Sequence, residues 1–440
     1  MKDLDELILK INNLPDGYIS SKKINGKTYH YLQRRKLGKV LSLYIKESEL
    51  DFYKSALKER KDIEEALAKY LNRGDVLKEN LSKRDLELTG DIMCEDRIAV
   101  SIYKDKPIFI NYEICPLEFL KGSTLSAFLK RRTLDEDRVN SRLLRKALNL
   151  ESKEFKDLPL YVYGACVTDN YWFKPKGCKL HYKDIVFKSD NYHELSLKGD
   201  TRFISKKPMR NPQLTLLGSY EKAWRLIDKT WYLYKCGSED ERFSEMFVSL
   251  LAKELGIPTA LYELDEDYIK TKNFADKYNF EPMSALAGDD QSYENVFNVC
   301  LSVNREIAKQ YLLLMWFDCI VFNYDRHNEN LGFLKNKKNG NIISLAPNFD
   351  NNNSLISRNN VLLEDRSKDQ FINNFVKFIK SNNTAFVLFK EITLPNLTKN
   401  NFVNCFNNIS IKRNEENICK FILNGYETLN FKLNWFWKID

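Results

Sequence analysis

The strongest constraint on the fold of this chain is one long apolar run that ends in a group of polar residues. Leu312 to Phe322 is apolar at every position except Asp318, a pattern that indicates a buried helix. The run is too short to span a bilayer. Asn304 is a good N-cap residue and Glu306 follows in the first turn, so the helix is predicted to begin near Asn304.

The residues that follow this helix predict a loop, a hairpin and a second polar site. The segment from Asn323 to Leu334 has the sequence NYDRHNENLGFL. The chain becomes apolar after Asn330, is interrupted by Lys337 to Asn341, and is apolar again from Ile342, a pattern typical of a hairpin. Asp350 comes soon after the hairpin, at the end of the sequence APNFD.

Two carboxylates and an amide in this region have the spacing that phosphate transfer requires. In kinases an Asp orients the acceptor hydroxyl or takes its proton, while an Asn in the same loop and a later Asp hold magnesium against the nucleotide phosphates. Asp325, Asn330 and Asp350 fit this layout. The alternative is that the first two belong to a surface turn and that Asp350 caps a loop.

Asp318 raises a separate question, because a carboxylate inside an apolar run must be paired. Arg326 or His327 could pair with it and so fix the shape of the loop. A simple hydrogen-bonded structural role for Asp318 is the alternative.

The motifs resemble the C-terminal lobe of HipA-type serine/threonine kinases, the toxin kinases of bacterial toxin–antitoxin systems. That family has the approximate signature N-x-D-R-H-x-x-N, followed by P-x-[YF]-D-x-x-x-[SL]. The resemblance implies an ATP- and Mg2+-dependent protein kinase that phosphorylates itself. Asp325 would be its base, and Asn330 and Asp350 its metal ligands. A protein substrate such as a translation factor and an antitoxin protein are the partners that the family implies.

The resemblance also implies an α+β fold with a bilobal kinase architecture, in which a mixed, β-rich N-lobe precedes a mostly helical C-lobe. We expect a small basic β-hairpin and helix module at residues 1–75. The N-lobe, with the phosphate loop and the ATP lysine, is expected at 85–270. The helical C-lobe, with the catalytic loop and the metal-binding Asp, is expected at 271–440.

A second motif, from Thr215 to Trp224, is similar to the S-x-x-G-x-x-E-K loop that lies over the ATP phosphates in this family. A glycine lets the backbone approach a phosphate, and Gly218, Ser219 and Lys222 are the candidates for this contact. The loop lacks the G-K-[ST] run of a Walker A motif. The family phosphorylates a serine at the head of the loop; Thr215 occupies that position here, so it is the autophosphorylation candidate.

Lys235, at the end of the predicted strand Trp231 to Lys235, lies where the family has its ATP-binding lysine; an edge-strand lysine is the alternative. Glu245 falls on the predicted helix Asp240 to Leu255, where it could pair with Lys235 or remain a surface glutamate. Backbone groups at Ile269 to Lys272 are assigned to the adenine by position alone.

Several segments before residue 214 are assigned structure but no chemistry. Asn72 to Lys83 is expected to be a linker, and short strands are predicted at Ile98 to Ile102, Pro107 to Tyr112 and Leu160 to Tyr163. Thr124 to Leu150 is expected to be helical, with its five arginines on a solvated face. The stretch D-x-Y-W-x-K-P from Asp169 to Pro175 is interpreted as an aromatic structural corner.

One short segment within the N-terminal module accounts for the whole charge surplus of the protein. The formal net charge is +8. Between Gly17 and Lys46 there is no Asp or Glu and there are eight basic residues: Lys22, Lys23, Lys27, Arg34, Arg35, Lys36, Lys39 and Lys46. The 69 basic residues less these eight leave 61, which equals the number of acidic residues.

Asn25-Gly26 between β-formers predicts a hairpin within a three-stranded antiparallel sheet, and a helix is expected from Glu47 to about Leu71. Lysines with tyrosines between them could bind nucleic acid, chiefly through Lys22, Lys23, Lys27, Arg34 and Arg35. A solvated basic face that packs on a partner is the alternative.

Composition fits a protein of two or three domains. Nine scattered cysteines without a C-x-x-C pair argue against disulfides and zinc and favour a cytoplasmic protein. The first residues do not have the pattern of a signal peptide, and no membrane partner is expected. Two other functions stay open: a nucleic-acid-binding regulator with a degenerate kinase fold, and a lipid or small-molecule kinase, since D-R-H-x-x-N also occurs in phosphoinositide kinases.

Overall fold

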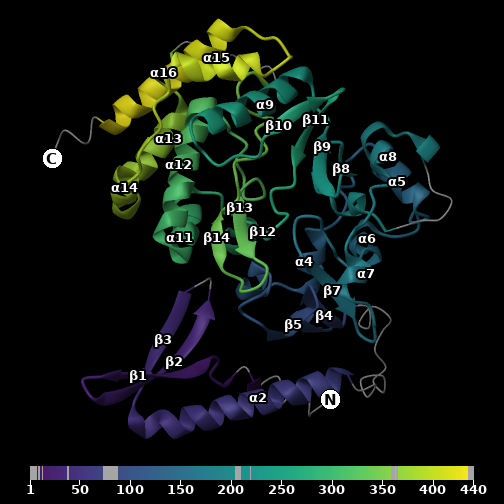
Figure 1. The fold of residues 1–440 in the computed structure, drawn as a ribbon, viewed down its shortest axis with the longest axis vertical. Coiled ribbons are helices and arrows are strands. Elements are labelled where there is room, and N and C mark those ends of the chain that lie inside the picture. The colour runs from purple at the N-terminus through teal and green to yellow at the C-terminus, as the bar shows by residue number, and fades with distance from the viewer. Residues whose placement is uncertain are drawn as a thin grey trace.

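The computed structural model describes residues 7, 10–11, 13–36, 39–72, 88–203, 210–218, 220–357, 362 and 365–434. The described part has an α+β fold, as predicted, and contains four separate antiparallel sheets (Figure 1). The N-terminal module, the two sheets of the middle part and the helical C-terminal part follow one another along the chain. None of the described helices combines the length and apolar character needed to cross a bilayer.

The N-terminal module contains the predicted three-stranded sheet and helix. Its elements are β1 Tyr18–Ile24, β2 Lys27–Lys36, β3 Lys39–Ile45 and α2 Leu50–Asn72. Asn25 and Gly26 both have positive φ, at 49° and 78°, which is the geometry of a two-residue type I′ hairpin turn. The predicted linker from Asn72 to Lys83 lies mostly outside the described residues.

The next sheet has the strand order β6-β5-β4-β7 and carries short helices around it. Its strands are β4 Gly90–Cys94, β5 Arg97–Tyr103, β6 Lys106–Ile110 and β7 Tyr171–Pro175. The helices are α4 Leu125–Lys130, α5 Ser141–Ala147, α6 Leu158–Tyr161, α7 Tyr182–Ile185 and α8 His193–Lys198. Tyr171, Trp172 and Phe173 of β7 are buried, in agreement with a structural role for the aromatic stretch.

Two predictions for this region are wrong. Leu160 to Tyr163 is not a strand: the short helix α6 covers Leu158–Tyr161, with Pro159 in its first turn, where proline's missing N–H costs no helical hydrogen bond. Thr124 to Leu150 is two short helices rather than one. Two of its arginines, Arg132 and Arg138, are buried in ion pairs rather than solvated, because acidic partners far along the chain fold against them.

The third sheet has the order β10-β11-β9-β8, and the helix α9 follows the hairpin of β8 and β9 at one edge of the sheet. The elements are β8 Lys222–Ile227, β9 Thr230–Lys235, α9 Glu239–Glu254, β10 Tyr262–Asp265 and β11 Tyr268–Lys272. A capping box begins α9: Glu241 N donates to Ser238 Oγ over 3.3 Å, and Ser238 N donates to Glu241 Oε2 over 2.8 Å. This rigid start fixes the direction of the helix that carries Glu245.

The last part of the chain packs around one buried helix. The small sheet is formed by β12 Tyr278–Pro282, β13 Gly332–Asn336 and β14 Ile342–Leu345, and the helices α10 to α16 make up the rest of this part. These helices are α10 Ser284–Ala287, α11 Tyr293–Val303, α12 Arg305–Val321, α13 Gln370–Ser381, α14 Asn383–Lys390, α15 Lys399–Asn407 and α16 Glu415–Asn434.

The helix α12 confirms the expectation from the apolar run. Asn304 is its N-cap and accepts a 2.8 Å hydrogen bond from Ile307 N. The helix contacts α11, α13, α14 and α16, and its Trp316 and Phe317 are fully buried. It ends at Phe322 in the left-handed conformation (φ 56°). The polar segment that begins at Asn323 is therefore held directly against the core.

Candidate active site

One cavity of about 580 Å³ lies between the middle and C-terminal parts of the chain and collects most of the predicted site residues. Eight of them line it: Thr215, Gly218, Lys222, Lys235, Asp325, His327, Asn330 and Asp350. Glu245 and Arg326 lie behind this lining and contact it, and Asp318 pairs with Arg326. Ser219 lies outside the described residues. Segments from Thr215 to Asp350 thus meet at one place.

Lys235 joins Glu245 and Asp350 in one buried ion cluster. Lys235 Nζ, at the end of β9, lies 2.7 Å from Glu245 Oε2 on α9 and also donates to Asp350 Oδ1. The side chains of Lys235 and Glu245 are 6% and 0% exposed, whereas that of Asp350 keeps 25%. Glu245 Oε1 accepts a 2.7 Å hydrogen bond from Asn351 N. The strand, the helix and the segment around Asp350 are therefore fixed relative to one another.

The pKa values in this cluster follow from one ammonium shared by two carboxylates. Burial disfavours the charged form of Lys235, but Asp350 and Glu245 outweigh it and raise the lysine pKa well above its usual value. Burial likewise raises the pKa of Glu245. For Asp350 burial acts in the same direction, yet Lys235 and Lys222 overcome it and lower the pKa. Asp350, which faces the cavity, is the more strongly ionised of the two carboxylates.

Arg326 holds the loop after α12 and the segment before Asp350 together. Its Nε and Nη2 each donate over 2.9 Å to the two oxygens of Asp318, so the predicted pairing of Asp318 is made by Arg326. His327 Nδ1 instead accepts from Glu329 N over 3.2 Å. The other donors of Arg326 reach Asn330 O (3.0 Å), Phe349 O (2.5 Å), Asn348 Oδ1 (2.6 Å) and Asn351 Oδ1 (2.9 Å).

Asp325 is oriented by a residue that sequence analysis missed. Asn353 Nδ2 donates to Asp325 Oδ2 over 2.5 Å, and the Asn353 side chain is buried. Asn330 Nδ2 donates to the Asp325 carbonyl over 3.3 Å, which turns its own carbonyl oxygen toward other partners. One carboxylate oxygen of Asp325 is thus held in place by Asn353.

Gly218 and Lys222 meet closely at the upper wall of the cavity. Gly218 has φ +95°, and a Cβ at this position would lie 2.6 Å from Lys222 Nζ. A glycine is therefore favoured by the backbone conformation, whereas the flexible end of Lys222 could move aside for a Cβ. Burial lowers the pKa of Lys222 to about 8; Lys235 and Arg138 act in the same direction and Asp350 opposes them. An anion in the cavity would be favoured by the charged form of Lys222.

Thr215 lies in the short 3₁₀ turn Pro212–Thr215, just before Gly218, and is buried. Its Oγ1 donates to Pro212 O over 2.8 Å. Gln213 fixes the turn to β8, because its side chain exchanges two hydrogen bonds with the Trp224 backbone, of 2.8 and 2.9 Å. In this conformation the hydroxyl of Thr215 faces the protein interior and the cavity rather than bulk solvent.

The wall of the cavity nearest to β9 is apolar and aromatic. Leu233, Tyr262, Phe280 and Phe349 line it, with the rings of Phe280 and Phe349 5.7 Å apart. The assignment of the adenine to backbone groups of Ile269 to Lys272 is wrong. Strand β11 pairs with β10 on one side and β9 on the other, so its backbone groups are used within the sheet, and these residues do not line the cavity.

Polar residues between positions 118 and 169 line the same cavity, although the sequence assigned them no chemistry. They are Glu118, Arg131, Arg132, Thr168 and Asp169. Arg132 pairs with Asp169 at 2.6 Å. Arg131 reaches across to Ser284 Oγ of α10 over 3.2 Å. The charged residues in and near D-x-Y-W-x-K-P were the only sequence signal for this wall.

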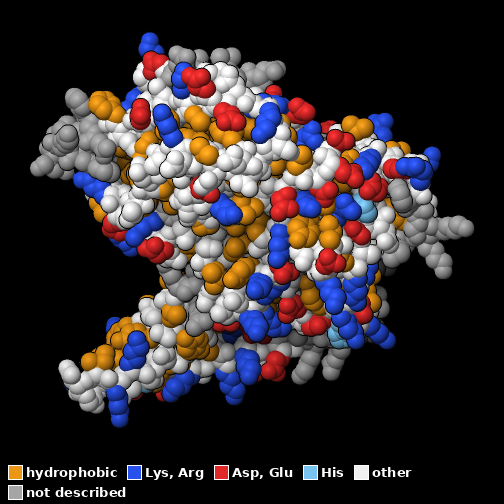
Figure 2. All heavy atoms as spheres, turned by 45° about the horizontal axis from the view of Figure 1, so that its top comes forward, with side chains coloured by type: hydrophobic (Ala, Val, Ile, Leu, Met, Phe, Trp, Pro, Cys, Tyr) orange, Lys and Arg blue, Asp and Glu red, His pale blue; other side chains and the backbone are white. Residues whose placement is uncertain are grey.

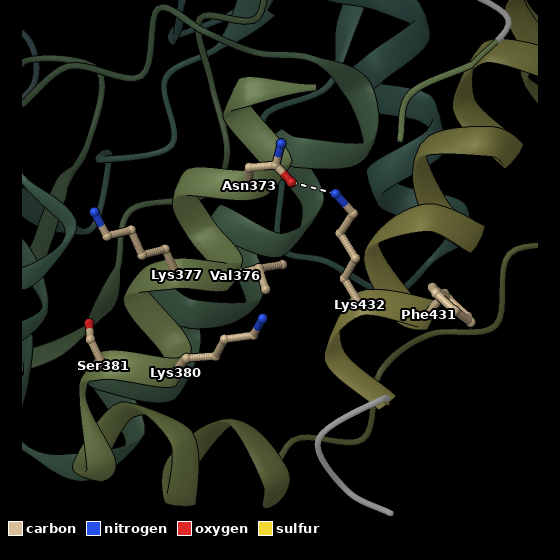
Figure 3. A pocket seen from close by; sticks show the side chains of 7 residues that line it. All are labelled: Asn373, Val376, Lys377, Lys380, Ser381, Phe431 and Lys432. Atoms are coloured by element: carbon tan, nitrogen blue, oxygen red, sulfur yellow. Dashed lines mark hydrogen bonds between the residues drawn. The ribbon is translucent and has the colours of Figure 1, made fainter. Parts of the chain in front are cut away.

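A second hollow, of about 550 Å³, lies between α13 and α16 and contains none of the predicted site residues (Figure 3). Lys377, Lys380, Lys432 and Phe431 line it, and Lys432 donates hydrogen bonds to Asn373 Oδ1 and, over 2.6 Å, to Ser367 O. It adjoins the end of the described chain. The chemistry predicted from the sequence therefore belongs to the other cavity alone.

The cavity between the middle and C-terminal parts contains a lysine–glutamate pair and two polar loops. Residues 214–400 match the family model described as the HipA-like C-terminal domain, so the recognition of this domain from the sequence motifs is confirmed. A comparison with curated proteins gave no match.

Two solved structures are similar to parts of this chain. The crystal structure of the Helicobacter pylori proinflammatory kinase CtkA has 16% identity and a TM-score of 0.39, with 51% of this chain and 95% of that chain covered. HipA of Shewanella oneidensis MR-1, solved with HipB and operator DNA, has 11% identity and a TM-score of 0.43, with 71% and 85% covered. With TM-scores this low, neither likeness identifies a shared activity.

Proposed function

We propose that this protein is a HipA-type kinase that transfers the γ-phosphate of ATP to a serine or threonine of a protein. The single observation that carries the proposal is the convergence of Lys235, Asp325, Asn330 and Asp350 on one cavity. Kinase chemistry needs little beyond placement of the reactants and neutralisation of phosphate charge. A matched HipA-like domain over residues 214–400 supports the same assignment.

The geometry of the cavity supports a role for each of these residues. Lys235, fixed by Glu245 as a kinase lysine is fixed by its helix glutamate, would bind nucleotide phosphates together with the Gly218 loop and Lys222. The apolar wall formed by Leu233, Phe280 and Phe349 would hold the adenine. Asp325 would accept the proton of the attacking hydroxyl while that oxygen bonds to the γ-phosphorus and the bond to ADP breaks.

The donors at Asn330 and Asp350 fit magnesium. Both offer the hard oxygen ligands that magnesium prefers, and Asp350 is held ionised by its neighbours. Among the described residues there is no cluster of three or more His, Cys, Asp or Glu that could hold a metal ion. Two protein oxygens completed by phosphates and water are the usual arrangement for magnesium in kinases, where the bound ion neutralises developing phosphate charge.

The proposal includes autophosphorylation at Thr215. The buried hydroxyl can be phosphorylated only after the turn Pro212–Thr215 leaves its place on β8. A phosphate there would then repel nucleotide phosphates beside Gly218. The family resemblance adds a cytoplasmic location, an antitoxin protein as partner and a translation factor as substrate. These three parts of the proposal are based on the resemblance alone and not on the residues of the cavity.

The test is transfer of labelled phosphate from ATP with magnesium to Thr215 or to a protein of a cell extract. Asp325→Asn and Asp350→Asn should each lower the rate about 100-fold or more. Asp289→Asn, at an exposed site outside the cavity, is the matched control and should retain the rate. Transfer that survives both site variants would refute the assignment. Label on Thr215 that appears in Asp325→Asn would refute the role of this residue alone.

A further inference from the structure

The N-terminal sheet projects away from the rest of the molecule and presents unpaired aromatic surface to solvent. Figure 2 shows the arm with hydrophobic and basic side chains, separated by a notch from the body of the protein. Tyr18 and Tyr44 are 52% and 51% exposed. Large exposed aromatics on a soluble surface usually mark an interaction site, and this arm contributes no residue to the candidate active site.

The strand register sorts these side chains onto two faces. Tyr31 lies directly opposite Tyr44, Tyr29 lies opposite Lys22, and residues two apart on a strand share a face. Tyr18, Lys22, Tyr29, Tyr31 and Tyr44 therefore share one face, which we call the tyrosine face. The ring centroid of Tyr44 lies 6.2 Å from that of Tyr29 and 5.8 Å from that of Tyr31. Lys22 Nζ lies 5.8 Å from the ring centroid of Tyr31.

The opposite face differs in chemistry. Lys23 lies opposite Thr28 and Arg34 opposite Leu41, beside the exposed Leu43. The acidic Glu47 pairs with His30 on that side, at 3.4 Å. The basic residues singled out by sequence thus do not form one surface: Lys22 and Lys27 share the tyrosine face, while Lys23 and Arg34 do not. The side chain of Arg35 lies outside the described residues.

We infer that the tyrosine face binds single-stranded nucleic acid. Neighbouring tyrosine rings with lysines beside them are suited to stack on unpaired bases while the lysines neutralise phosphates. In a duplex the base faces are already stacked and hidden. The segment Gly17 to Lys46 has eight basic and no acidic residues, so an anionic partner is favoured and a second copy of the same arm is repelled.

The experiment uses the full chain and fluorescence anisotropy with labelled oligomers of about 12 nucleotides: oligo-U, oligo-dT and a duplex of equal length. Both single strands should bind more tightly than the duplex. Affinity should fall when salt rises from about 50 to about 200 mM, because counterions are released on binding. Absence of binding at the lower salt, or equal affinity for the duplex, would overturn the inference.

Matched variants separate the face from general charge. Lys22→Glu should weaken binding about tenfold or more, whereas Lys23→Glu, with the same charge change on the other face, should weaken it less than about threefold. Tyr44→Ala should weaken binding about tenfold. Tyr44→Phe should bind as tightly as the wild type, because stacking needs the ring rather than the hydroxyl. The thermal unfolding of each variant checks that the sheet is intact.

Two results from the variants would count against the tyrosine face. Equal losses in Lys22→Glu and Lys23→Glu, together with no effect of Tyr44→Ala, would show charge attraction without a site. A concentration-dependent dimer, detected by sedimentation and abolished by Tyr44→Ala, would show that the face is instead a contact between copies of the chain.

Discussion

The buried pair of Asp318 and Arg326 gives the sharpest test of how the active site is supported. Their side chains are 0% and 3% exposed and are joined by two 2.9 Å hydrogen bonds. Burial raises the pKa of Asp318 even beside Arg326, so forming this ion pair is not by itself a large source of stability. Removing one charge has a different effect, because the remaining guanidinium stays buried without its counter-charge.

Asp318→Asn keeps the size of the side chain and one acceptor but loses the charge. Breaking a buried ion pair in this way lowers the free energy of unfolding by about 3–5 kcal/mol. Because Asn keeps one hydrogen bond to Arg326, we expect a loss of about 3 kcal/mol. That is a large part of the stability of a typical domain, about 5–15 kcal/mol, yet it leaves the protein folded. In a urea titration the midpoint should fall by up to about 1 M, because the slope for a chain of this size is at least about 3 kcal/mol per M.

Catalysis should suffer as well, because Arg326 also holds Asn330 O, Phe349 O and the amide side chains of Asn348 and Asn351. A guanidinium released from Asp318 can shift, and the loop carbonyls shift with it. We expect phosphate transfer to fall about tenfold or more under conditions where the variant is fully folded, since misplacement by about 1 Å can cost about 100-fold.

Asp369→Asn is the matched control within the same lobe. Arg366 and Asp369 form a similarly buried pair at 2.7 Å. Neither residue lines the cavity, although Arg366 also donates to Cys319 O and Ile320 O of α12. Asn can keep the cap that Asp369 makes on α13. This variant should lose comparable stability and retain transfer. A loss of stability below about 1 kcal/mol in Asp318→Asn, or equal losses of transfer in the two variants, would refute the reasoning.

Two further predictions concern the cavity itself. Lys222 should make nucleotide binding pH-dependent, because its pKa of about 8 means that its positive charge is lost as pH rises from 7 to above 8. The Kd for ATP, measured by calorimetry, should therefore increase over that pH range. The variant Lys222→Met should lack this increase. Asn353→Ala should lower transfer about tenfold while leaving the Kd for ATP unchanged, because Asn353 orients Asp325 rather than the nucleotide; an equal rise in Kd would contradict this role.

Local signals were enough to predict the elements that carry the candidate site. The apolar run with its N-cap at Asn304, the hairpin after Asn330 and the periodic helix containing Glu245 each depend on residues close in sequence. Side-chain pairs a few residues apart, such as Asp318 with Arg326, are also within reach of such reasoning, since a buried carboxylate needs a nearby partner.

Contacts between segments that are distant in the sequence could not be predicted from local patterns. Arg132 and Arg138 resemble the arginines of a solvated helix until the chain brings Asp169, 37 residues away, and Glu221, 83 residues away, against them. Burial of a charge is decided by its partner, and no local pattern names that partner. The short helix α6 was mistaken for a strand for a similar reason: four residues carry too little periodicity to distinguish the two.

The position of Asn353 shows why the motif alone does not describe the candidate site. Its spacing of 28 residues from Asp325 has no helical or strand period, so the pair is visible only after Arg326 has joined the two loops. The same guanidinium binds both the loop of Asp325 and the segment of Asp350. The positions of the proposed base Asp325 and the proposed metal ligand Asp350 therefore both depend on Arg326. A substitution that frees the Arg326 side chain should displace both residues.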